Sequence, residues 1–596
     1  MQARRHGHGW ADARYGPGGM MIAEIFKRIR DEGQHPVWIS LSDERTAVAN
    51  AESIDPALPL AGMPFAVKDN FDVAGMPTTA GCPPFAYVPE RTAPVVQRLL
   101  DAGAILIGKT NMDQFATGLV GTRSPYGACS SVYDSRYISG GSSSGSAVAV
   151  AKSLCAFSLG TDTAGSGRVP AAFNNLIGLK PTRGLLSTTG VVPACRSLDC
   201  VSIFARTVVE ARTVWDVARG FDAKDPYSRI LPASACAAPW LSGSFRFGVP
   251  DDAQLKFFGD EETPRLYRQA AERLECLGGI RTTIDFTVFR EAAELLYSGP
   301  WVAERFAAVG EFLSHTNDGV NEVVKNIILG GAKYSAVDAF RSMYRLETLK
   351  QRAAELWADI DVLLLPTAGT IYTHEAVAAD PVRLNSNLGF YTNFVNLMDL
   401  AAVAVPAGFR SDGLPFGVSI IGPAFSDQAL LVLAERYGGG SAVDDLAPGC
   451  VLLAVVGAHL SGQPLNHALT DRGSRLVKTC RTAENYRLYA LSSMCPTKPG
   501  LICDPKFNGW GVEVEIWNMP LKEFGSFVAE IPPPLGIGTI RLEDGSLVKG
   551  FICETAGLDG AEEITRFGGW RNYLSWREIK NLKLDESCIS NPKSEM

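Results

Sequence analysis

The sequence predicts an α/β protein, a large mixed β-sheet flanked by helices, followed by a smaller, strand-rich C-terminal domain. Two observations support this fold class: helical and apolar strand patterns alternate through the first part of the chain, and runs punctuated by Gly and Pro dominate the last part. The length of 596 residues is several times that of a usual domain, so two or more domains are expected.

The individual elements follow from their periodicity. IAEIFKRIRDEG has the spacing of a helix, and PFAVKDN is a short apolar strand that ends on Lys68. APVVQRLLDAG predicts a helix ended by Gly103, and AILIGKT predicts the strand after it. Further strands are expected at ADIDVLLLPT, LAAVAVPAG and FGVSIIGP, with DQALLVLAER as a closing helix. This alternation is typical of a mixed α/β sheet.

The domain boundary is expected where the composition changes. RYGGGSAVDDLAPGC combines a triple glycine with turn and acidic residues, as linkers do. We therefore expect a disordered lead-in over 1–21, a first domain over 22–437, a linker over 438–450, a second domain over 451–580 and a tail over 581–596.

Composition excludes several classes of partner. A net charge of −8 without a basic cluster argues against nucleic acid, and the apolar runs are too short to cross a membrane. The N-terminus lacks the apolar core of a secretory signal. Thirteen cysteines without a C-x-x-C pair suggest free thiols in a reducing cytoplasm rather than a metal site. We expect no metal and no cofactor.

Small residues surround Ser166 in the segment TDTAGSGR. Ala164, Gly165 and Gly167 allow a tight turn that aims backbone N–H groups at a developing oxyanion. A serine hydroxyl needs a base before it can act as a nucleophile. By itself such a loop is more often only a flexible turn.

The spacing of three segments gives this loop its meaning. Lys68 at a strand end, Ser142 in GGSSSGSA 74 residues later and Ser166 another 24 residues on resemble the amidase signature family. The resemblance covers roughly residues 22–437. It implies a Lys68–Ser142–Ser166 triad, with Ser166 as nucleophile and Ser142, preceded by a cis peptide, as the bridging serine.

The implied mechanism requires a neutral Lys68, which takes a proton from Ser142 while Ser142 takes one from Ser166. Because the ordinary pKa of lysine is about 10.4, burial must lower it. The resemblance also implies which backbone N–H groups form the oxyanion hole: Thr163, Ala164, Gly165 and Ser166.

Local sequence points to a substrate. TGLVGTRSPYG, the residues 163–187 and LYSGPWVAERFAAVG resemble allophanate hydrolases within that family. Arg305 and Tyr297 are therefore expected to bind the carboxylate and amide of allophanate, with Gly121 and Thr122 as weaker candidates. Gly299 and Pro300 interrupt any helix between Tyr297 and Arg305.

Two other interpretations of this region remain open. Without the resemblance, Tyr297 packing in the core and Arg305 pairing with Glu304 or Glu294 at the surface would be equally reasonable. Asn174 and Asn175, which follow the catalytic loop, are expected to cap or pack rather than to touch substrate.

The C-terminal region resembles the second domain of allophanate hydrolases, a gamma-glutamyl-cyclotransferase-like barrel. The resemblance implicates it in converting N-carboxycarbamate to carbon dioxide and ammonia, with His459 and Asn466 as candidate residues. A purely structural role for His459, or assembly as the domain's main task, is the alternative. The resemblance also implies urea or s-triazine nitrogen use, association with urea carboxylase and a homodimer.

Two rival functions are left. GSSSG at 141–145 matches the nucleophile elbow with Ser143 at its centre, which would make the chain an α/β-hydrolase esterase, although His315 and His374 have no telling context. The chain is alternatively another small-amide amidase or a glutamine amidase subunit that passes ammonia to a partner.

Overall fold

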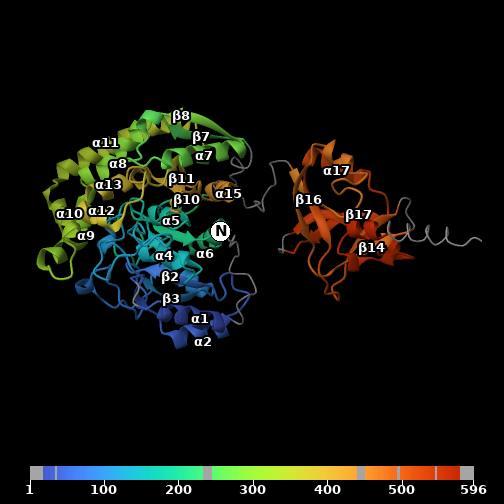
Figure 1. The fold of residues 1–596 in the computed structure, drawn as a ribbon, viewed down its shortest axis with the longest axis horizontal. Coiled ribbons are helices and arrows are strands. Elements are labelled where there is room, and N and C mark those ends of the chain that lie inside the picture. Colours follow the sequence, from blue (N-terminus) through green and yellow to red (C-terminus); the bar gives the residue numbers. More distant parts are fainter. Residues whose placement is uncertain are drawn as a thin grey trace, which may run out of the picture. The chain divides into compact units, whose positions relative to one another are not determined.

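The computed structural model describes residues 18–33, 36–232, 244–438, 450–492, 497–543 and 547–577. The chain divides into two compact units, Met1–Gly440 and Ser441–Met596, and each is described by itself (Figure 1). Residues 439–449 of the expected linker, 1–17 of the expected lead-in and the whole expected tail lie outside the described residues. The remaining lead-in residues, 18–21, belong to the first helix, so the lead-in is shorter than expected.

The first unit is built on one mixed sheet of eleven strands, as the sequence predicts. Their order is β1-β3-β2-β4-β6-β5-β10-β11-β9-β7-β8, and parallel pairs stand at both ends of a central antiparallel block. The strands are β1 (Trp38–Leu41), β2 (Pro64–Lys68), β3 (Ile105–Thr110), β4 (Phe157–Thr161), β5 (Ile177–Lys180), β6 (Val201–Ala205), β7 (Phe245–Pro250), β8 (Gly279–Ile284), β9 (Val362–Pro366), β10 (Leu400–Phe409) and β11 (Pro415–Pro423).

Helices cover both faces of this sheet (Figure 1). They are α1 (Gly18–Asp31), α2 (Glu44–Ser53), α3 (Pro94–Asp101), α4 (Ser144–Ala151), α5 (Val169–Phe173), α6 (Val208–Ala218), α7 (Thr263–Cys276), α8 (Thr287–Ser298), α9 (Trp301–His315), α10 (Glu322–Leu329), α11 (Ala336–Trp357), α12 (His374–Ala379), α13 (Arg383–Leu388), α14 (Phe394–Leu397) and α15 (Asp427–Tyr437). Short 3₁₀ turns include η2 (Gln114–Ala116) and η6 (Gly330–Lys333). The break between α8 and α9 falls at Gly299 and Pro300, as predicted.

The alternation of side chains along β2 decides where Lys68 points. Phe65 and Val67 belong to the core cluster shared with α3, α6 and α15, whereas Ala66 packs in the cluster formed by α4. Because successive strand residues face opposite sides, Lys68 lies on the same face as Ala66. Burying Phe65 and Val67 stabilises the strand by roughly 1.5–3 kcal/mol each, an upper estimate.

Helix α4 is buried against that face. Its residues 144–150 are all buried, and they are Ser, Gly, Ala or Val. Small side chains let the helix approach the sheet closely; a Cβ at Gly145 would lie 2.4 Å from the Val37 carbonyl oxygen. The Gly/Ser-rich sequence is thus a packing requirement as well as a loop signal.

The second unit is strand-rich, as expected, but its strands form two sheets where the resemblance implied one barrel. A five-stranded sheet has the order β13-β16-β12-β18-β17, and a three-stranded sheet has the order β15-β14-β19. Its elements are β12 (Cys450–Val455), α16 (His467–Thr470), β13 (Arg475–Arg481), β14 (Tyr486–Leu491), β15 (Lys498–Cys503), β16 (Glu513–Pro520), α17 (Leu521–Ala529), β17 (Leu535–Arg541), β18 (Leu547–Cys553) and β19 (Glu562–Glu563).

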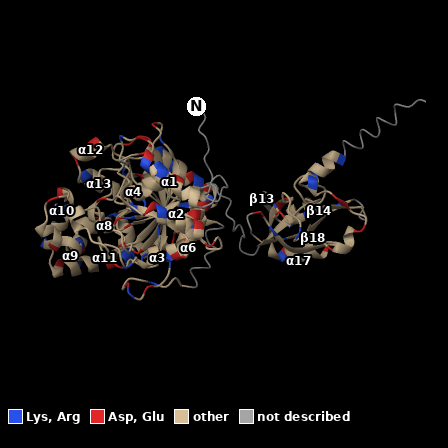
Figure 2. Cartoon of the chain, turned by 90° about the horizontal axis from the view of Figure 1, so that it is seen from below, with Lys and Arg blue, Asp and Glu red and all other residues tan. Residues whose placement is uncertain are grey.

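Charges of both signs are interspersed on the surface helices. Figure 2 shows Lys/Arg and Asp/Glu side by side on α1 and α2, where Arg30 pairs with Glu44. Among the helices that the structure describes, none is both long and apolar enough to span a membrane.

Candidate active site

Lys68 lies at the end of β2 in a fully buried hydroxyl cluster. Its Nζ is 2.7 Å from Ser142 Oγ and 2.8 Å from Thr161 Oγ1. Ser142 precedes α4 and Thr161 ends β4, the strand beside β2, so three neighbouring elements deliver these groups. In the described chain the ammonium has no carboxylate within ion-pair distance.

Burial lowers the pKa of Lys68 from 10.5 to about 7, as the sequence predicts. The carboxylates of Asp113, Asp199 and Asp162 act in the opposite direction at longer range, and Arg305 adds to the lowering. A lysine with a pKa of about 7 is neutral in a large fraction of molecules at neutral pH, and a neutral amine can accept a proton.

The peptide bond between Gly141 and Ser142 is cis, as the resemblance implies. The next residue, Ser143, is buried, and its Oγ donates to the Thr161 carbonyl oxygen at 3.2 Å. His374 lies 3.0 Å from Ser130 Oγ, and His315 Nδ1 lies 2.9 Å from the Glu311 carbonyl oxygen. Neither histidine is paired with Ser143, so the nucleophile elbow lacks its base.

Ser166 lies on the loop between β4 and α5, whose shape depends on Asp162. Asp162 accepts from the N–H groups of Gly165 and Gly167 at 2.7 and 3.1 Å. It also forms two hydrogen bonds with the buried Arg168, at 2.8 and 3.0 Å. Although burial alone would raise the pKa of Asp162, Arg168 lowers it. The loop is therefore wrapped around an ionised carboxylate.

This arrangement corrects one expectation about the oxyanion hole. The Gly165 N–H donates to Asp162, so it is not available to a substrate oxygen. Within the described residues, the N–H groups of Thr163, Ala164 and Ser166 have no protein acceptor. Three of the four expected donors remain.

The segment that follows η2 ties the two serine loops together. Ser166 Oγ lies 3.5 Å from the Gly118 carbonyl oxygen, and the Gly141 N–H donates to the Leu119 carbonyl oxygen at 2.9 Å. Ser166 is 3% exposed and Ser142 is fully buried. The two serines therefore meet the same two-residue stretch from loops 24 residues apart in sequence.

Arg305 is buried beside this segment, at 2% exposure. Its Nη1 donates to Thr117 Oγ1 at 2.9 Å and to the Ala116 carbonyl oxygen at 3.3 Å. The guanidinium carbon lies 5.8 Å from the centre of the Tyr297 ring. Arg305 has no carboxylate within ion-pair distance in the described structure, which excludes a surface pairing with Glu304 or Glu294.

The two glutamates have other contacts. Glu304 accepts from the Ser197 N–H at 2.8 Å, and Glu294 lies 3.6 Å from Arg290.

Gly121 has a structural task. Its φ is +75°, and an added Cβ would lie 2.5 Å from the Gly140 carbonyl oxygen, so only glycine fits against the serine loop. Its N–H donates to Asp113 Oδ2 at 3.0 Å and is not free for substrate, contrary to expectation. Thr122 is half-buried. Asn174 bonds the carbonyls of Ser139 and Pro170, which is the structural role predicted for it.

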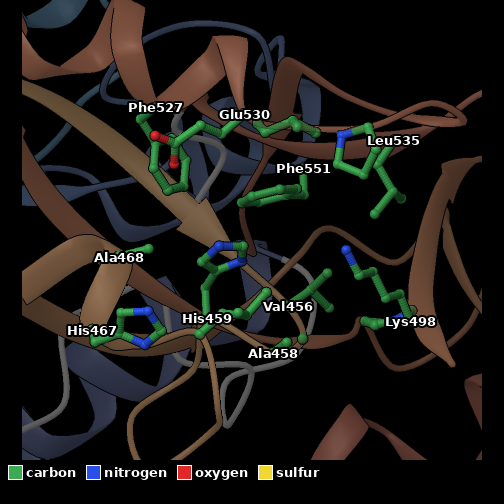
Figure 3. A pocket seen from close by; sticks show the side chains of 15 residues that line it. Val456, Ala458, His459, His467, Ala468, Lys498, Phe527, Glu530, Leu535 and Phe551 are labelled. Atoms are coloured by element: carbon green, nitrogen blue, oxygen red, sulfur yellow. The ribbon is translucent and has the colours of Figure 1, made fainter. Parts of the chain in front are cut away.

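The second unit contains a pocket of about 220 Å³ around His459 (Figure 3). The imidazole stacks on Phe551 at 4.9 Å and meets Phe527 edge-on at 5.4 Å. Burial, reinforced by Lys498, lowers the pKa of His459 to about 4. Asn466 does not line the pocket; its side chain donates to the His459 carbonyl oxygen at 2.9 Å and so holds the loop.

Sequence reasoning did not single out Thr161, Asp162, Asp113 or Thr117. Thr161 and Asp162 stand in GTDTAGS itself, and a polar side chain at a buried strand end was the signal that could have found them. Asp113 and Thr117 had no such signal because their contacts are with distant segments. The described residues contain no group of three or more His, Cys, Asp or Glu that could hold a metal ion.

Comparison with known proteins agrees with this geometry. Residues 22–431 match the Amidase family model, and residues 451–575 match the model of the allophanate hydrolase C-terminal domain. A subunit of the glutamyl-tRNA(Gln) amidotransferase from Prochlorococcus marinus is 35% identical over 456 residues, which cover 70% of this chain and 92% of the relative.

Two similarities extend over nearly the whole chain. Urea amidolyase from Lachancea kluyveri is 44% identical over 607 residues, covering 96% of this chain; the chain spans about a third, 33%, of that relative. The solved structure of Kluyveromyces lactis allophanate hydrolase is 43% identical, with a TM-score of 0.67, covering 94% of this chain and 97% of that one.

Proposed function

Because the chain belongs to the amidase family, we propose that it hydrolyses the terminal amide of allophanate, releasing ammonia and N-carboxycarbamate. The observation that carries the proposal is the fully buried Lys68, 2.7 Å from Ser142 Oγ and without a counter-ion in the described structure. Such a lysine is costly to bury unless its amine is used neutral. The choice of substrate is supported by the match of residues 451–575 and by the buried Arg305.

In the proposed reaction Lys68 takes the proton of Ser142, and Ser142 takes that of Ser166. Ser166 Oγ then attacks the terminal carbonyl carbon. The proton returns along the same relay to the leaving nitrogen, the C–N bond breaks and ammonia departs. Water attacks the acyl-enzyme by the same relay and regenerates Ser166.

The N–H groups of Thr163, Ala164 and Ser166 are the proposed oxyanion donors. Because the Asp162–Arg168 pair holds the loop in place, these dipoles need no reorganisation as charge develops on the carbonyl oxygen. A preorganised donor of this kind is worth about 10²-fold or more in rate.

Arg305 is the proposed carboxylate clamp, with Tyr297 beside it. Only Nη1 of its guanidinium has protein partners in the described structure, at Thr117 and Ala116. The remaining N–H groups can bind a carboxylate with the two-point geometry that arginine favours. Thr122 remains a candidate for a further contact.

The decisive experiment compares Ser166→Ala with Ser143→Ala. Ammonia release is measured from allophanate, biuret, malonamide, urea and glutamine. We expect Ser166→Ala to abolish release while Ser143→Ala, if folded, retains it. Allophanate should be the best substrate; equal turnover of simple amides would remove the substrate assignment and keep the amidase one. Glutamine hydrolysis that depends on a partner protein would favour the amidotransferase alternative.

We also propose that the second unit converts N-carboxycarbamate to carbon dioxide and ammonia in the pocket around His459. The support is a buried imidazole with a lowered pKa next to the Lys498 ammonium, which can attract an anion (Figure 3). His459→Ala should leave the first ammonia release intact and slow the second. Loss of both steps would assign the pocket to folding or assembly.

The supply of allophanate and the assembly of the chain are further parts of the proposal. We propose a urea carboxylase as the source of allophanate, a cytoplasmic location and a homodimer. The similarity to urea amidolyases supports the first of these. Adding the chain to a urea carboxylase with urea, bicarbonate and ATP should produce ammonia; sedimentation of the chain alone tests the dimer.

A further inference from the structure

Tyr297 also lines a pocket that the proposed mechanism does not use. This pocket has a volume of about 260 Å³ and lies between α8, α10, η6 and α13. The polar residues used in the argument are Arg123, Tyr297, Asn326, Lys333, Tyr334 and Asn385. Lys333 is exposed and Arg123 is buried, so the pocket runs from the surface into the unit.

The lining of this pocket carries charge of one sign. Lys333 and Arg123 are its charged residues, and no Asp or Glu lines it. The chain as a whole has a net charge of −8, which repels anions at long range. A cleft lined by positive charge and low-dielectric walls raises the local concentration of anions against such a background.

Arg123 is held in place but has hydrogen-bonding capacity left. It is 3% exposed; its Nη1 donates to the Thr117 carbonyl oxygen at 3.0 Å and its Nη2 to the Pro381 carbonyl oxygen at 2.6 Å. Its buried Nε has no partner in the described structure. None of these side-chain contacts is with a carboxylate, so a buried cation retains a donor for an anion.

A single segment separates this pocket from the nucleophile. Thr117 binds Arg123 through its carbonyl oxygen and Arg305 through its hydroxyl, and the next carbonyl, that of Gly118, faces Ser166 Oγ. Tyr297 lies between the two arginines in the same sense, since its ring is 5.8 Å from the Arg305 guanidinium and also lines the pocket.

We propose that this pocket is an anion-selective vestibule through which substrates with a carboxylate reach Ser166 in preference to neutral amides of the same shape. The inference rests on the proposed amidase function. Lys333 attracts the anion at the rim, Arg123 receives it farther in, and Arg305 binds it during reaction. Selectivity thus comes partly from residues that never touch the reacting carbonyl.

The test uses Lys333→Glu in the full chain, because Lys333 is exposed and its replacement does not disturb the core. Lys350→Glu on α11 is the matched control, with the same change in net charge at a residue outside the pocket that pairs with Glu347. Two substrate pairs differ mainly in charge: allophanate against biuret, and malonamate against malonamide. For each, kcat/KM is measured at low and at 0.5 M salt.

We expect Lys333→Glu to lower kcat/KM for the two anions about 3- to 10-fold at low salt, through KM, and to leave the neutral amides unchanged. High salt should remove the difference, Lys333→Arg should retain wild-type selectivity, and Lys350→Glu should match the wild type. Equal effects on charged and neutral substrates, or no effect, would overturn the vestibule. If the wild-type protein cleaves malonamate but not allophanate, the substrate assignment fails while the malonamate pair still tests the vestibule.

Discussion

At the scale of single residues, burial rather than charge pairing sets the chemistry. Lys68 has hydroxyl groups of Ser142 and Thr161 around it, and its burial brings its pKa to about 7. An ion pair with a carboxylate would raise that pKa and keep the amine protonated. The structure places Asp113, Asp199 and Asp162 close enough to oppose the shift but not to cancel it.

Activity should therefore depend on pH through Lys68. Below a pH of about 7 the amine takes up a proton and cannot accept one from Ser142, so kcat/KM should fall about tenfold per pH unit on the acid side and level off above pH 8. A pH profile of allophanate hydrolysis measures this. Lys68→Arg stays charged and should lose about 10³-fold or more; a flat profile between pH 5 and 8 would exclude Lys68 as the base.

Thr161 is expected to act by positioning Lys68. Thr161→Val removes the acceptor 2.8 Å from Nζ while keeping the shape of the side chain, and kcat should fall about tenfold. Because that acceptor stabilises the charged amine, the acid limb of the pH profile should also move to lower pH. Thr161→Ser serves as control and should restore both; a loss of kcat with an unmoved limb would indicate a structural effect only.

At the scale of elements, the loop from β4 to α5 is organised by one carboxylate. Asp162 gathers two backbone N–H groups and the Arg168 guanidinium, all buried. Asn396 further binds the Asp162 carbonyl oxygen at 2.6 Å. The loop thus has a fixed course although its sequence is rich in small residues, and the direction of each N–H follows from it.

Replacing this carboxylate should cost both stability and activity. Asp162→Asn leaves the Arg168 charge buried without a counter-ion, and we expect the free energy of unfolding to fall by about 3–5 kcal/mol. Denaturant unfolding gives this value. Asp380→Asn, which breaks the exposed pair with Arg383, should leave stability essentially unchanged. A double variant with Arg168→Met should recover part of the loss; strict additivity would show that the two residues do not act as a pair.

At the scale of the whole molecule, the chain separates two proposed reactions into two compact units. Each unit has its own hydrophobic core, with the clusters of the first unit distinct from that around Leu453, Ile516 and Phe551 in the second. A product that must leave one unit and be consumed in the other is exposed to solvent in between. The division predicts that the steps can be uncoupled.

A truncated chain ending at Gly440 should release one ammonia from each allophanate at the full-length rate. The full chain should release two at the same rate, because the second unit removes N-carboxycarbamate faster than it decays. Coupled measurement of ammonia and carbon dioxide in the first seconds distinguishes the two. Inactivity of a folded, truncated chain would instead show that the first unit needs the second.

The sequence by itself determined the strands, helices and principal serines of the site. Periodicity and small-residue patterns act over a few neighbours, so the end of β2 at Lys68, the course of α4 and the break at Gly299 and Pro300 could be predicted from local rules. The spacing of Lys68, Ser142 and Ser166 was likewise readable without coordinates.

Only the tertiary structure decided which of those groups are usable. Thr117 and Arg305 are 188 residues apart, and no local pattern relates them. The capture of the Gly165 N–H by Asp162 and of the Gly121 N–H by Asp113 depends on how loops fold onto buried carboxylates. Periodicity is a property of the backbone within one element, whereas the environment of a buried charge is set by packing between elements.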